Sequence, residues 1–361
     1  VGGMAPVVGA GAGNEGFRIM RHCLVGGVVA LALFALPATA QTTLTLGLYG
    51  GSFEKAMREV VVPAFQKQHK VEFKFVAGNS TDTLARLHAQ KAKQEMDVVF
   101  LDDGVMFQSV ALGFCAPLAD GPVYKELYEI AHIPGNKAVA AGFVATGITY
   151  NKKYFADKGW PAPTSWHDIG DAKYKKLLAL SPITGTYGLH VLVMLARVNG
   201  GSETAIEPGF KAMQTVGPNV LTFPPSPAKM SEAMQAGDVV ISIWGSGRTV
   251  ALANTGFPVE FVYPKEGAVA LMVGVCPVVK PDASELAQKF IQFNLMPEIQ
   301  AVMAKEQGFG PVNRNTKLDP DVAKQVPYGP EQIAKLIAVD WNVINKEREG
   351  WTKRWQREVE K

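Results

Sequence analysis

Three stretches near the beginning of the chain decide the fold: LTLGLYGGS (residues 44–52), VEFKFVAGNST (71–81) and DVVFLDDG (97–104). Each starts as an apolar or alternating run of strand length and ends in a turn rich in Gly, Asn, Ser or Asp. Residues 53–69 and 83–93 then carry apolar side chains at helical spacing. This β-turn-α order predicts parallel strands covered by helices on both faces, with a ligand at the carboxyl ends of the strands.

The rest of the chain continues the same alternation without an internal repeat or a Pro/Ser-rich linker. The pattern predicts strands over 177–181, 239–244 and 268–279, and helices over 190–199, 205–215, 285–294 and 298–307. Because two blocks of this kind follow one another without a loose linker, we expect the chain to cross between them on extended strands.

Length and composition are those of a globular protein. The chain has 361 residues, of which 47% are hydrophobic and 19% charged, enough for two ordinary domains. The formal net charge is +3, from 36 Lys+Arg against 33 Asp+Glu. Nucleic acid is therefore not an expected partner, because its binders carry a clear basic surplus.

Residues 1–40 resemble a secretion signal with upstream residues. Met20-Arg21-His22 precedes an apolar run over 24–36 and the small-residue end Pro37-Ala38-Thr39-Ala40. We expect translation to start at Met20, cleavage before Gln41 and a periplasmic location; a retained membrane anchor is the alternative. Cys23 stands at the front of the apolar run rather than at the cleavage site, which argues against a lipoprotein.

Two cysteines, Cys115 and Cys276, remain in the mature chain. Export permits a disulfide between them, and two buried free thiols are the other interpretation. The sequence has no CxxC and no paired-His spacing, so we expect no metal and no cofactor.

Motifs spread over residues 44–330 resemble the bacterial extracellular solute-binding proteins of the spermidine/putrescine type. They are the strand-Gly-Gly start, Ile148-Thr149-Tyr150-Asn151, Thr164-Ser165-Trp166-His167-Asp168-Ile169, Met234-Gln235-Ala236-Gly237-Asp238-Val239, Ile243-Trp244, Val262-Tyr263-Pro264-Lys265-Glu266-Gly267 and Gly310-Pro311-Val312-Asn313. The resemblance implies an α/β, two-lobe periplasmic-binding-protein-like fold (type II), with lobes joined by two crossover strands. Lobe one would be 42–148 and 275–325, lobe two 149–270, and 326–361 a C-terminal helical segment.

The same resemblance implies the mode of action. A small-molecule ligand would bind between the lobes and shift the population toward a closed form. The closed form would then dock on an ABC permease in the inner membrane. We expect a monomer that is not an enzyme.

The polyamine-binding members of this family hold their cationic ligand with acids that are absent here. The turn expected to carry two acids reads SPITGT (residues 181–186), and the crossing expected to carry Trp and Asp reads LMV (271–273). A buried polycation without those carboxylates would be unpaired, which costs several kcal/mol per charge. The predicted ligand is therefore not a polyamine, although a spermidine/putrescine-binding protein remains the first alternative.

Arg248 supplies the opposite charge. It follows a strand end in Trp244-Gly245-Ser246-Gly247-Arg248, and its guanidinium can grip a carboxylate or phosphonate; a surface arginine in a first helical turn is the alternative. The other predicted ligand-binding residues are polar or aromatic residues at strand ends: Tyr49, Ser52, Asn79, Ser80, Asp103, Thr184, Tyr187 and Trp244. Helix capping is the competing interpretation for Ser52, Asn79, Ser80 and the two aspartates, above all Asp102.

An arginine in one lobe that faces an aspartate in the other suits an ω-amino acid or an aminophosphonate. If the aspartates only cap, a plain organic acid fits better. Two rivals of other classes remain: a sensor subunit that binds the same ligand, and an enzyme on the same fold that uses Cys115 or Cys276 as its nucleophile.

Overall fold

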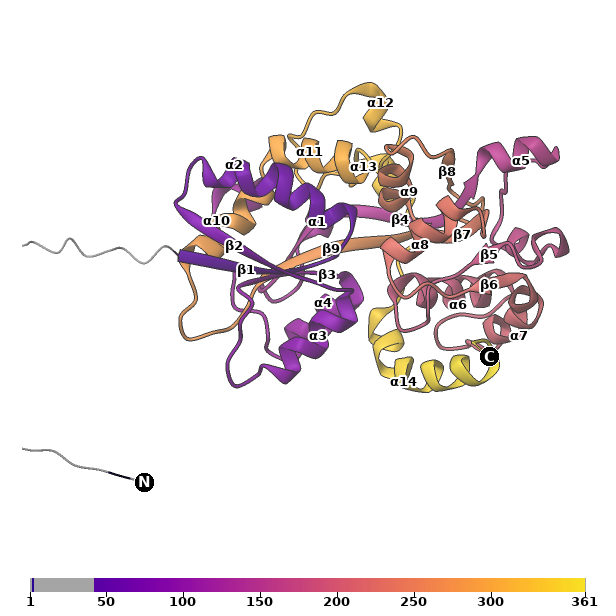
Figure 1. Cartoon of the computed structure of the whole chain (residues 1–361), viewed down its shortest axis with the longest axis horizontal. Coiled ribbons are helices and arrows are strands. Elements are labelled where there is room, and N and C mark those ends of the chain that lie inside the picture. The colour runs from indigo at the N-terminus through magenta and orange to yellow at the C-terminus, as the bar shows by residue number, and fades with distance from the viewer. Residues whose placement is uncertain (1, 3–41, 361) are drawn as a thin grey trace, which may run out of the picture. The chain divides into compact units, whose positions relative to one another are not determined.

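The computed structural model describes Gly2 and residues 42–360 (Figure 1). The predicted signal peptide and its cleavage site lie outside the described residues. Contacts between Cα atoms separate residues 1–40 from 41–361 as two units, and only the second is described below. No helix within the described residues is long and apolar enough to cross a membrane.

Strands and helices alternate along the whole of the second unit. The strands are β1 (Thr42–Leu48), β2 (Val71–Ala77), β3 (Val98–Asp102), β4 (Val139–Asn151), β5 (Leu178–Ala179), β6 (Val220–Thr222), β7 (Ile241–Gly245), β8 (Val259–Val262) and β9 (Val269–Pro277). The helices are α1 (Ser52–Ala56), α2 (Val62–Gln66), α3 (Ser80–Ala89), α4 (Asp103–Ala111), α5 (Lys152–Lys158), α6 (Thr186–Val198), α7 (Glu207–Val216), α8 (Pro227–Ala236), α9 (Ser246–Ala253), α10 (Glu285–Asn294), α11 (Pro297–Gln307), α12 (Pro320–Ala323), α13 (Pro330–Ala334) and α14 (Trp341–Glu358).

The strands form one mixed sheet in the order β2-β1-β3-β9-β4-β7-β5-β6, with β8 paired to β4. β1 runs parallel to β2 and β3, and β5 runs parallel to β6 and β7. The central strands β9 and β4 pair antiparallel to each other and to the strands beside them. These long strands connect the two parallel groups (Figure 1). The structure confirms the predicted α/β fold.

The apolar side chains gather in two large clusters, one on each side of this central pair. The first cluster takes Val144 of β4 and Leu271 of β9, together with residues of β1, β3, α2 and α10. The second takes Ile148 of β4 and Val269 of β9, together with residues of β5, β7, α6 and α14. Each central strand therefore passes from one core into the other within a few residues.

Most predicted elements appear close to their expected positions, and the differences have local causes. The helix expected over 53–69 is interrupted by a π-helical turn over Met57–Val61, just before Pro63, which lacks the N–H that a regular turn needs. The strand expected over 177–181 shortens to the two residues of β5. Short β6 and β8 were not predicted, because strands of three and four residues carry little periodic signal.

Cys115 and Cys276 form a disulfide, which decides the alternative that the sequence left open. Their Cα atoms are 5.7 Å apart and both residues are buried. The bond joins the end of β9 to the segment after α4, so neither sulfur is a free thiol.

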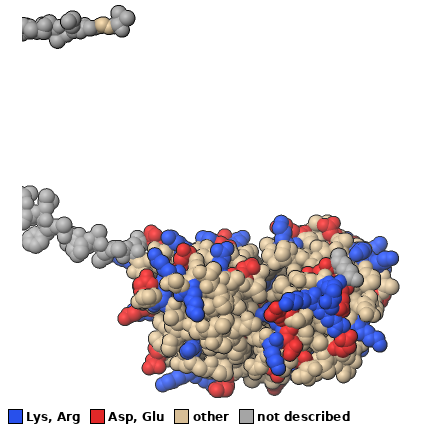
Figure 2. All heavy atoms as spheres, turned by 90° about the horizontal axis from the view of Figure 1, so that it is seen from below, with Lys and Arg blue, Asp and Glu red and all other residues tan. Residues whose placement is uncertain are grey.

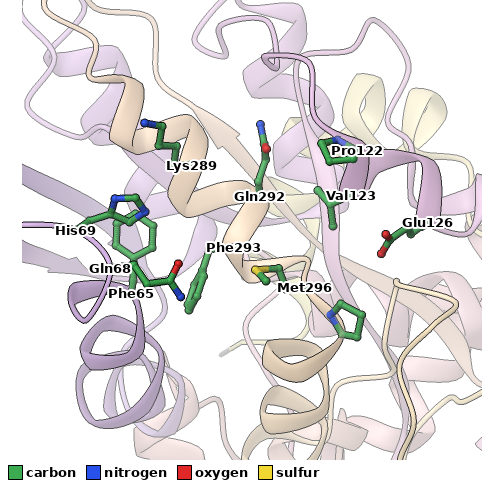
Figure 3. A pocket seen from close by; sticks show the side chains of 11 residues that line it. Phe65, Gln68, His69, Pro122, Val123, Glu126, Lys289, Gln292, Phe293 and Met296 are labelled. Carbon is green, nitrogen blue, oxygen red and sulfur yellow. The ribbon is translucent and has the colours of Figure 1, made fainter.

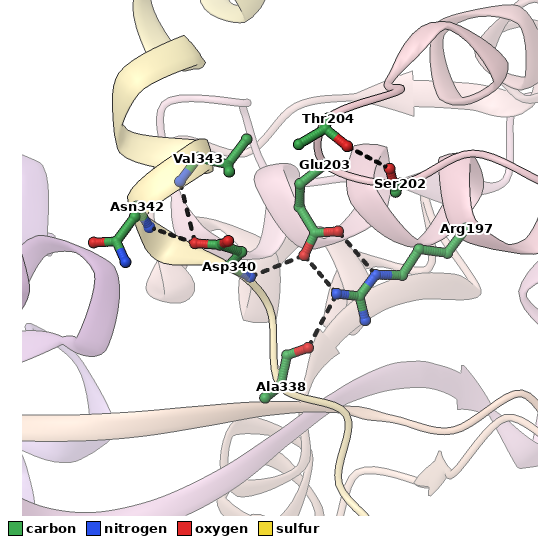
Figure 4. Close-up of polar contacts among 8 residues, drawn as sticks. All are labelled: Arg197, Ser202, Glu203, Thr204, Ala338, Asp340, Asn342 and Val343. Atoms are coloured by element: carbon green, nitrogen blue, oxygen red, sulfur yellow. Dashed lines mark hydrogen bonds and ion pairs between the residues drawn. The ribbon is translucent and has the colours of Figure 1, made fainter.

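The C-terminal helix α14 is fixed on the second core. Trp341, Ile344, Trp351 and Trp355 are buried in that core. At the start of α14, Glu203 pairs with Arg197 and accepts a hydrogen bond from the backbone N–H of Asp340 at 2.9 Å (Figure 4). Arg197 also donates to the carbonyl of Ala338 at 3.1 Å.

Surface charge is mixed in sign. On the face shown in Figure 2, both basic and acidic side chains are present on each half of the molecule, with large areas of other residues between them. This agrees with the near-neutral net charge of the chain.

Candidate functional site

The ends of the two parallel strand groups meet at Asp102, the last residue of β3. Its Oδ1 accepts a hydrogen bond from the Tyr49 hydroxyl at 2.6 Å, and its Oδ2 accepts one from the Thr186 hydroxyl. Its backbone N–H donates to Ser80 Oγ at 3.0 Å. Tyr49 and Ser80 follow β1 and β2, whereas Thr186 begins α6 on the second core. The side chain of Asp102 therefore bridges the two cores. We call the region around Asp102, Tyr49 and Thr186 the junction of the two cores.

Arg248 approaches the same place from α9. Its Nη1 donates to Ser52 Oγ at 3.4 Å, and its guanidinium lies 5.3 Å from the centre of the Tyr49 ring. Arg248 is half-buried, and among the described residues 42–360 no carboxylate lies within ion-pair distance of it. A half-buried guanidinium without an acid beside it is a ready binding group for an anion.

The two aspartates have roles that differ from the expectation. Asp102 is the N-cap residue of α4 but makes no capping hydrogen bond, because its carboxylate turns to Tyr49 and Thr186. Asp103 is buried, and its side chain accepts from the N–H of Gly104 at 2.9 Å and from that of Met272 at 3.4 Å. Burial raises the pKa of Asp103 to about 7, with the indole of Trp341 lowering it and Asp102 adding to the rise.

Four other predicted residues lie in different surroundings: one is beside Arg248, and the others cap a helix, pack in an apolar cluster or lie exposed. Tyr187 is half-buried at the start of α6, and a Cβ on Gly245 would lie 2.3 Å from its hydroxyl, so only glycine fits there. Asn79 caps α3 in a capping box with Asp82. Trp244 is buried in a small apolar cluster under α8 and α9. Thr184 is exposed and contributes its carbonyl oxygen, described below.

Both tyrosines are neutral hydroxyl donors at physiological pH. Burial, followed by the neighbouring charge of Asp102, raises the pKa of Tyr49 well above its ordinary value. Burial raises the pKa of Tyr187 to about 12, although Arg248 acts to lower it. Each hydroxyl can therefore donate to an anionic ligand or to Asp102 without losing its proton.

Helix N-termini add positive potential around these groups. α6 and α9 begin after Gly185 and Gly245, and neither helix has a side-chain cap on its first N–H groups. Uncapped N–H groups and the helix dipole together attract negative charge. The arrangement therefore strengthens the preference for an anion that Arg248 creates.

One charged residue of this region was not predicted. Arg348, on α14, is half-buried and donates from Nη2 to the carbonyl of Thr184 at 3.1 Å. Thr184 stands two residues before Thr186, the partner of Asp102. No local pattern in the sequence marks Arg348, because it lies 164 residues along the chain from its partner Thr184.

Open space lies next to Arg248. A pocket of about 290 Å³ is lined from the first half by Gly51 and Ser52 and from the second by Ala228, Trp244 and Arg248. A second pocket of about 350 Å³ lies within the first half, between α2, α10 and the segment before β4 (Figure 3). Phe65, Phe293 and Met296 give it an apolar floor, away from the strand ends described above.

The comparisons with known proteins identify the family of this chain. Residues 61–328 match the family model described as "bacterial extracellular solute-binding protein". The chain belongs to this family. Membership confirms the predicted resemblance, the role in solute binding and the location outside the cytoplasm.

Relatives of this solute-binding protein carry different ligands in their names. It is 26% identical over 326 residues to the γ-aminobutyric acid-binding protein of Pseudomonas aeruginosa, covering 85% of this chain and 88% of that one. It is 27% identical over 175 residues to the spermidine/putrescine-binding periplasmic protein of Salmonella typhimurium, covering 46% and 49%. In fold it resembles the periplasmic binding protein AfuA from Actinobacillus pleuropneumoniae with bound fructose-6-phosphate, at TM-score 0.75, 18% identity, and coverage of 89% and 99%.

Proposed function

We propose that this solute-binding protein is the periplasmic component of an ABC importer and captures a small carboxylate-bearing or zwitterionic solute. The solute would be an ω-amino acid, an aminophosphonate or an organic acid. The protein binds and delivers this solute without transforming it, as a monomer that docks on an inner-membrane permease. The observation that carries the proposal is Arg248, half-buried at the junction of the two cores with no acidic partner among residues 42–360.

The proposed binding movement is closure of two lobes. Lobe one comprises residues 42–148 and 275–325, lobe two comprises 149–270, and 326–361 is a C-terminal helical segment. The two apolar cores support this division. On β9, however, Val269 belongs to the second core and Leu271 to the first, so the boundary between the cores lies a few residues before residue 275. Among the strands of the described chain, β4 and β9 are the two that pass from one core to the other, which suits a hinge.

A carboxylate at Arg248 would meet complementary groups. Arg248 would hold it in two parallel hydrogen bonds, and Ser52 and Tyr187 would donate to it. A ligand amine, where there is one, would lie against Asp102. Enclosure by Trp244 and the surrounding apolar side chains would supply the remaining affinity.

A polyamine is the second candidate, because one relative is named for spermidine and putrescine. The site offers little support for it. A polyamine carries several positive charges, and residues 181–186 contribute no acid that would balance them beside Asp102. A polycation would also face the positive charge of Arg248.

An enzyme that uses a thiol is not supported either. Cys115 and Cys276 are joined to each other and buried, so neither can act as a nucleophile in this form.

A thermal-shift screen of residues 41–361 tests the proposal. A carboxylate at 100 times its Kd should stabilise the protein by about 2.7 kcal/mol. Replacing Arg248 by Gln should abolish that shift, because the charge-assisted bonds to the carboxylate are lost. Arg357→Gln is the matched control, since Arg357 is exposed and pairs with Glu358 at 2.9 Å. Stabilisation by spermidine or putrescine but by no carboxylate would contradict the proposal.

A further inference from the structure

A second half-buried arginine stands at the junction of the two cores. Arg248 comes from α9 and Arg348 from α14, and among the described residues neither lies within ion-pair distance of a carboxylate. The half-buried Arg197 and Arg354, by contrast, pair with Glu203 and Glu207. A desolvated guanidinium costs free energy unless an anion compensates it. An anionic ligand would therefore compensate the charge of Arg348 in the same way as that of Arg248.

Arg348 is held near the site by its backbone partner and by its helix. Its guanidinium lies on the carbonyl of Thr184, and Thr186 binds Asp102, so the arginine stands beside the uncapped start of α6. Burial lowers the pKa of Arg348, and the charge of Asp102 partly offsets this effect. The negative charge of Asp102 therefore acts on Arg348. Arg248 stands over the ring of Tyr49, which donates a hydrogen bond to Asp102.

The helix that carries Arg348 is rigidly placed. Trp341, Asn345 and Arg348 share one face of α14, because they are spaced by four and three residues. Asn345 accepts from Gln108 at 2.7 Å and donates to the carbonyl of Gly104 at 3.1 Å, so this face contacts α4. Arg354 pairs with Glu207 through two hydrogen bonds of 2.6 and 3.0 Å on the other core. A side chain on so constrained a helix can select ligands by geometry.

The charges at the junction do not balance without a ligand. Among the described residues, neither Arg248 nor Arg348 has a carboxylate within ion-pair distance, and the nearby Asp102 accepts hydrogen bonds from Tyr49 and Thr186. A solute with one carboxylate would satisfy Arg248 and leave Arg348 without a partner. A solute with two separated acidic groups would satisfy both.

We infer that Arg348 is a second ligand-binding residue and that the site takes a small solute with two separated carboxylate or other acidic groups. This inference rests on the proposed function and narrows its ligand class. Arg248 binds one acidic group at the start of α9, and Arg348 binds the other beside the start of α6. An amine on the same solute is accommodated at Asp102.

Calorimetric titration with two pairs of probes tests the inference. Glutamate differs from 4-aminobutyrate, and glutarate from butyrate, by one carboxylate each. The wild-type protein should bind the dicarboxylate of each pair at least tenfold more tightly. Arg348→Gln should remove that preference while leaving the affinity for the monocarboxylates within twofold. Arg348→Lys, which keeps the charge, should restore part of it, and Arg248→Gln should weaken all four probes.

Each other outcome overturns a defined part of the account. Equal wild-type affinity for the two members of each pair, or an unchanged preference in Arg348→Gln, would overturn the role of Arg348 but leave the proposed function intact. An equal loss for all four probes in Arg348→Gln would make Arg348 a structural residue of the closed form. Binding of none of the probes to the wild-type protein, with binding of spermidine, would overturn the proposed function as well.

Discussion

At the scale of single residues, neighbouring charged side chains at the junction have different surroundings. Asp102 and Asp103 are adjacent and chemically identical, but β3 turns one toward the junction and buries the other under Trp341. The sequence predicted ligand-binding roles for an acid at this turn and for an arginine at the start of α9, and these roles stay predictions. Which of the two aspartates faces the junction depends on backbone direction at the strand end, which no sequence pattern reports.

His190 gives a residue-scale prediction about pH. It is fully buried on α6, bonded to the Thr146 hydroxyl at 2.8 Å, and burial lowers its pKa to about 3. The unfolded chain takes up a proton near pH 6.5, whereas the folded protein does not. The stability contributed by neutral His190 is therefore complete above pH 6.5 and is lost as the pH falls toward 3.

The measurement is the difference in unfolding free energy between the wild-type protein and His190→Gln. We expect that difference to fall by about 2 kcal/mol between pH 7 and pH 5, at 1.36 kcal/mol per pKa unit. The comparison cancels the opposite contribution of Asp103, whose raised pKa makes the protein more stable as the pH falls through 7. A difference independent of pH would show that His190 takes up its proton at the same pH in the folded protein as in the unfolded chain.

At the scale of elements, the docking of α14 on α4 depends on the absence of a side chain. A Cβ on Gly104 would lie 2.3 Å from the ring of Trp341, so the indole needs glycine beneath it. Gly350, in the interior of α14, is different, because a Cβ added there would meet no atom within 4 Å. Nothing therefore obstructs a methyl group at position 350.

These two glycines form a matched pair of substitutions. Gly104→Ala should destabilise the protein by about 1–3 kcal/mol, because Trp341 must move. Gly350→Ala should stabilise it by about 0.5–1 kcal/mol, because alanine is the better helix former. Urea unfolding of both variants measures the two effects. Equal and small effects would show that α14 does not pack on α4 in solution.

At the scale of elements, the sequence predicted the local order of strands and helices but not the contacts between distant elements. The strand-turn-helix order of residues 44–104 predicted the parallel strands of the first half, because hydrophobic period reports local structure directly. The π-helical turn at Met57–Val61 and the contact of Arg348 with Thr184 were not predicted. The first depends on the backbone before a proline, and the second on tertiary packing across 164 residues of chain.

At the scale of the whole molecule, the two apolar cores can change their relative orientation, and such a change would alter the distances at the polar junction between them. β4 and β9 belong to both cores, so a rotation about them changes the distance between Arg248 and Ser52 without breaking either core. A ligand that contacts residues of both cores favours the closed arrangement over the open one. The free energy it supplies equals the difference between its binding free energies for the two arrangements.

A crystal structure of the protein with the carboxylate that stabilises it most tests the central claim directly. The account predicts the solute at the junction of the two cores, with a carboxylate oxygen about 3 Å from a guanidinium nitrogen of Arg248. A solute bound elsewhere, for example in the apolar pocket beside Phe65 and Phe293, with Arg248 free of contact, would contradict it.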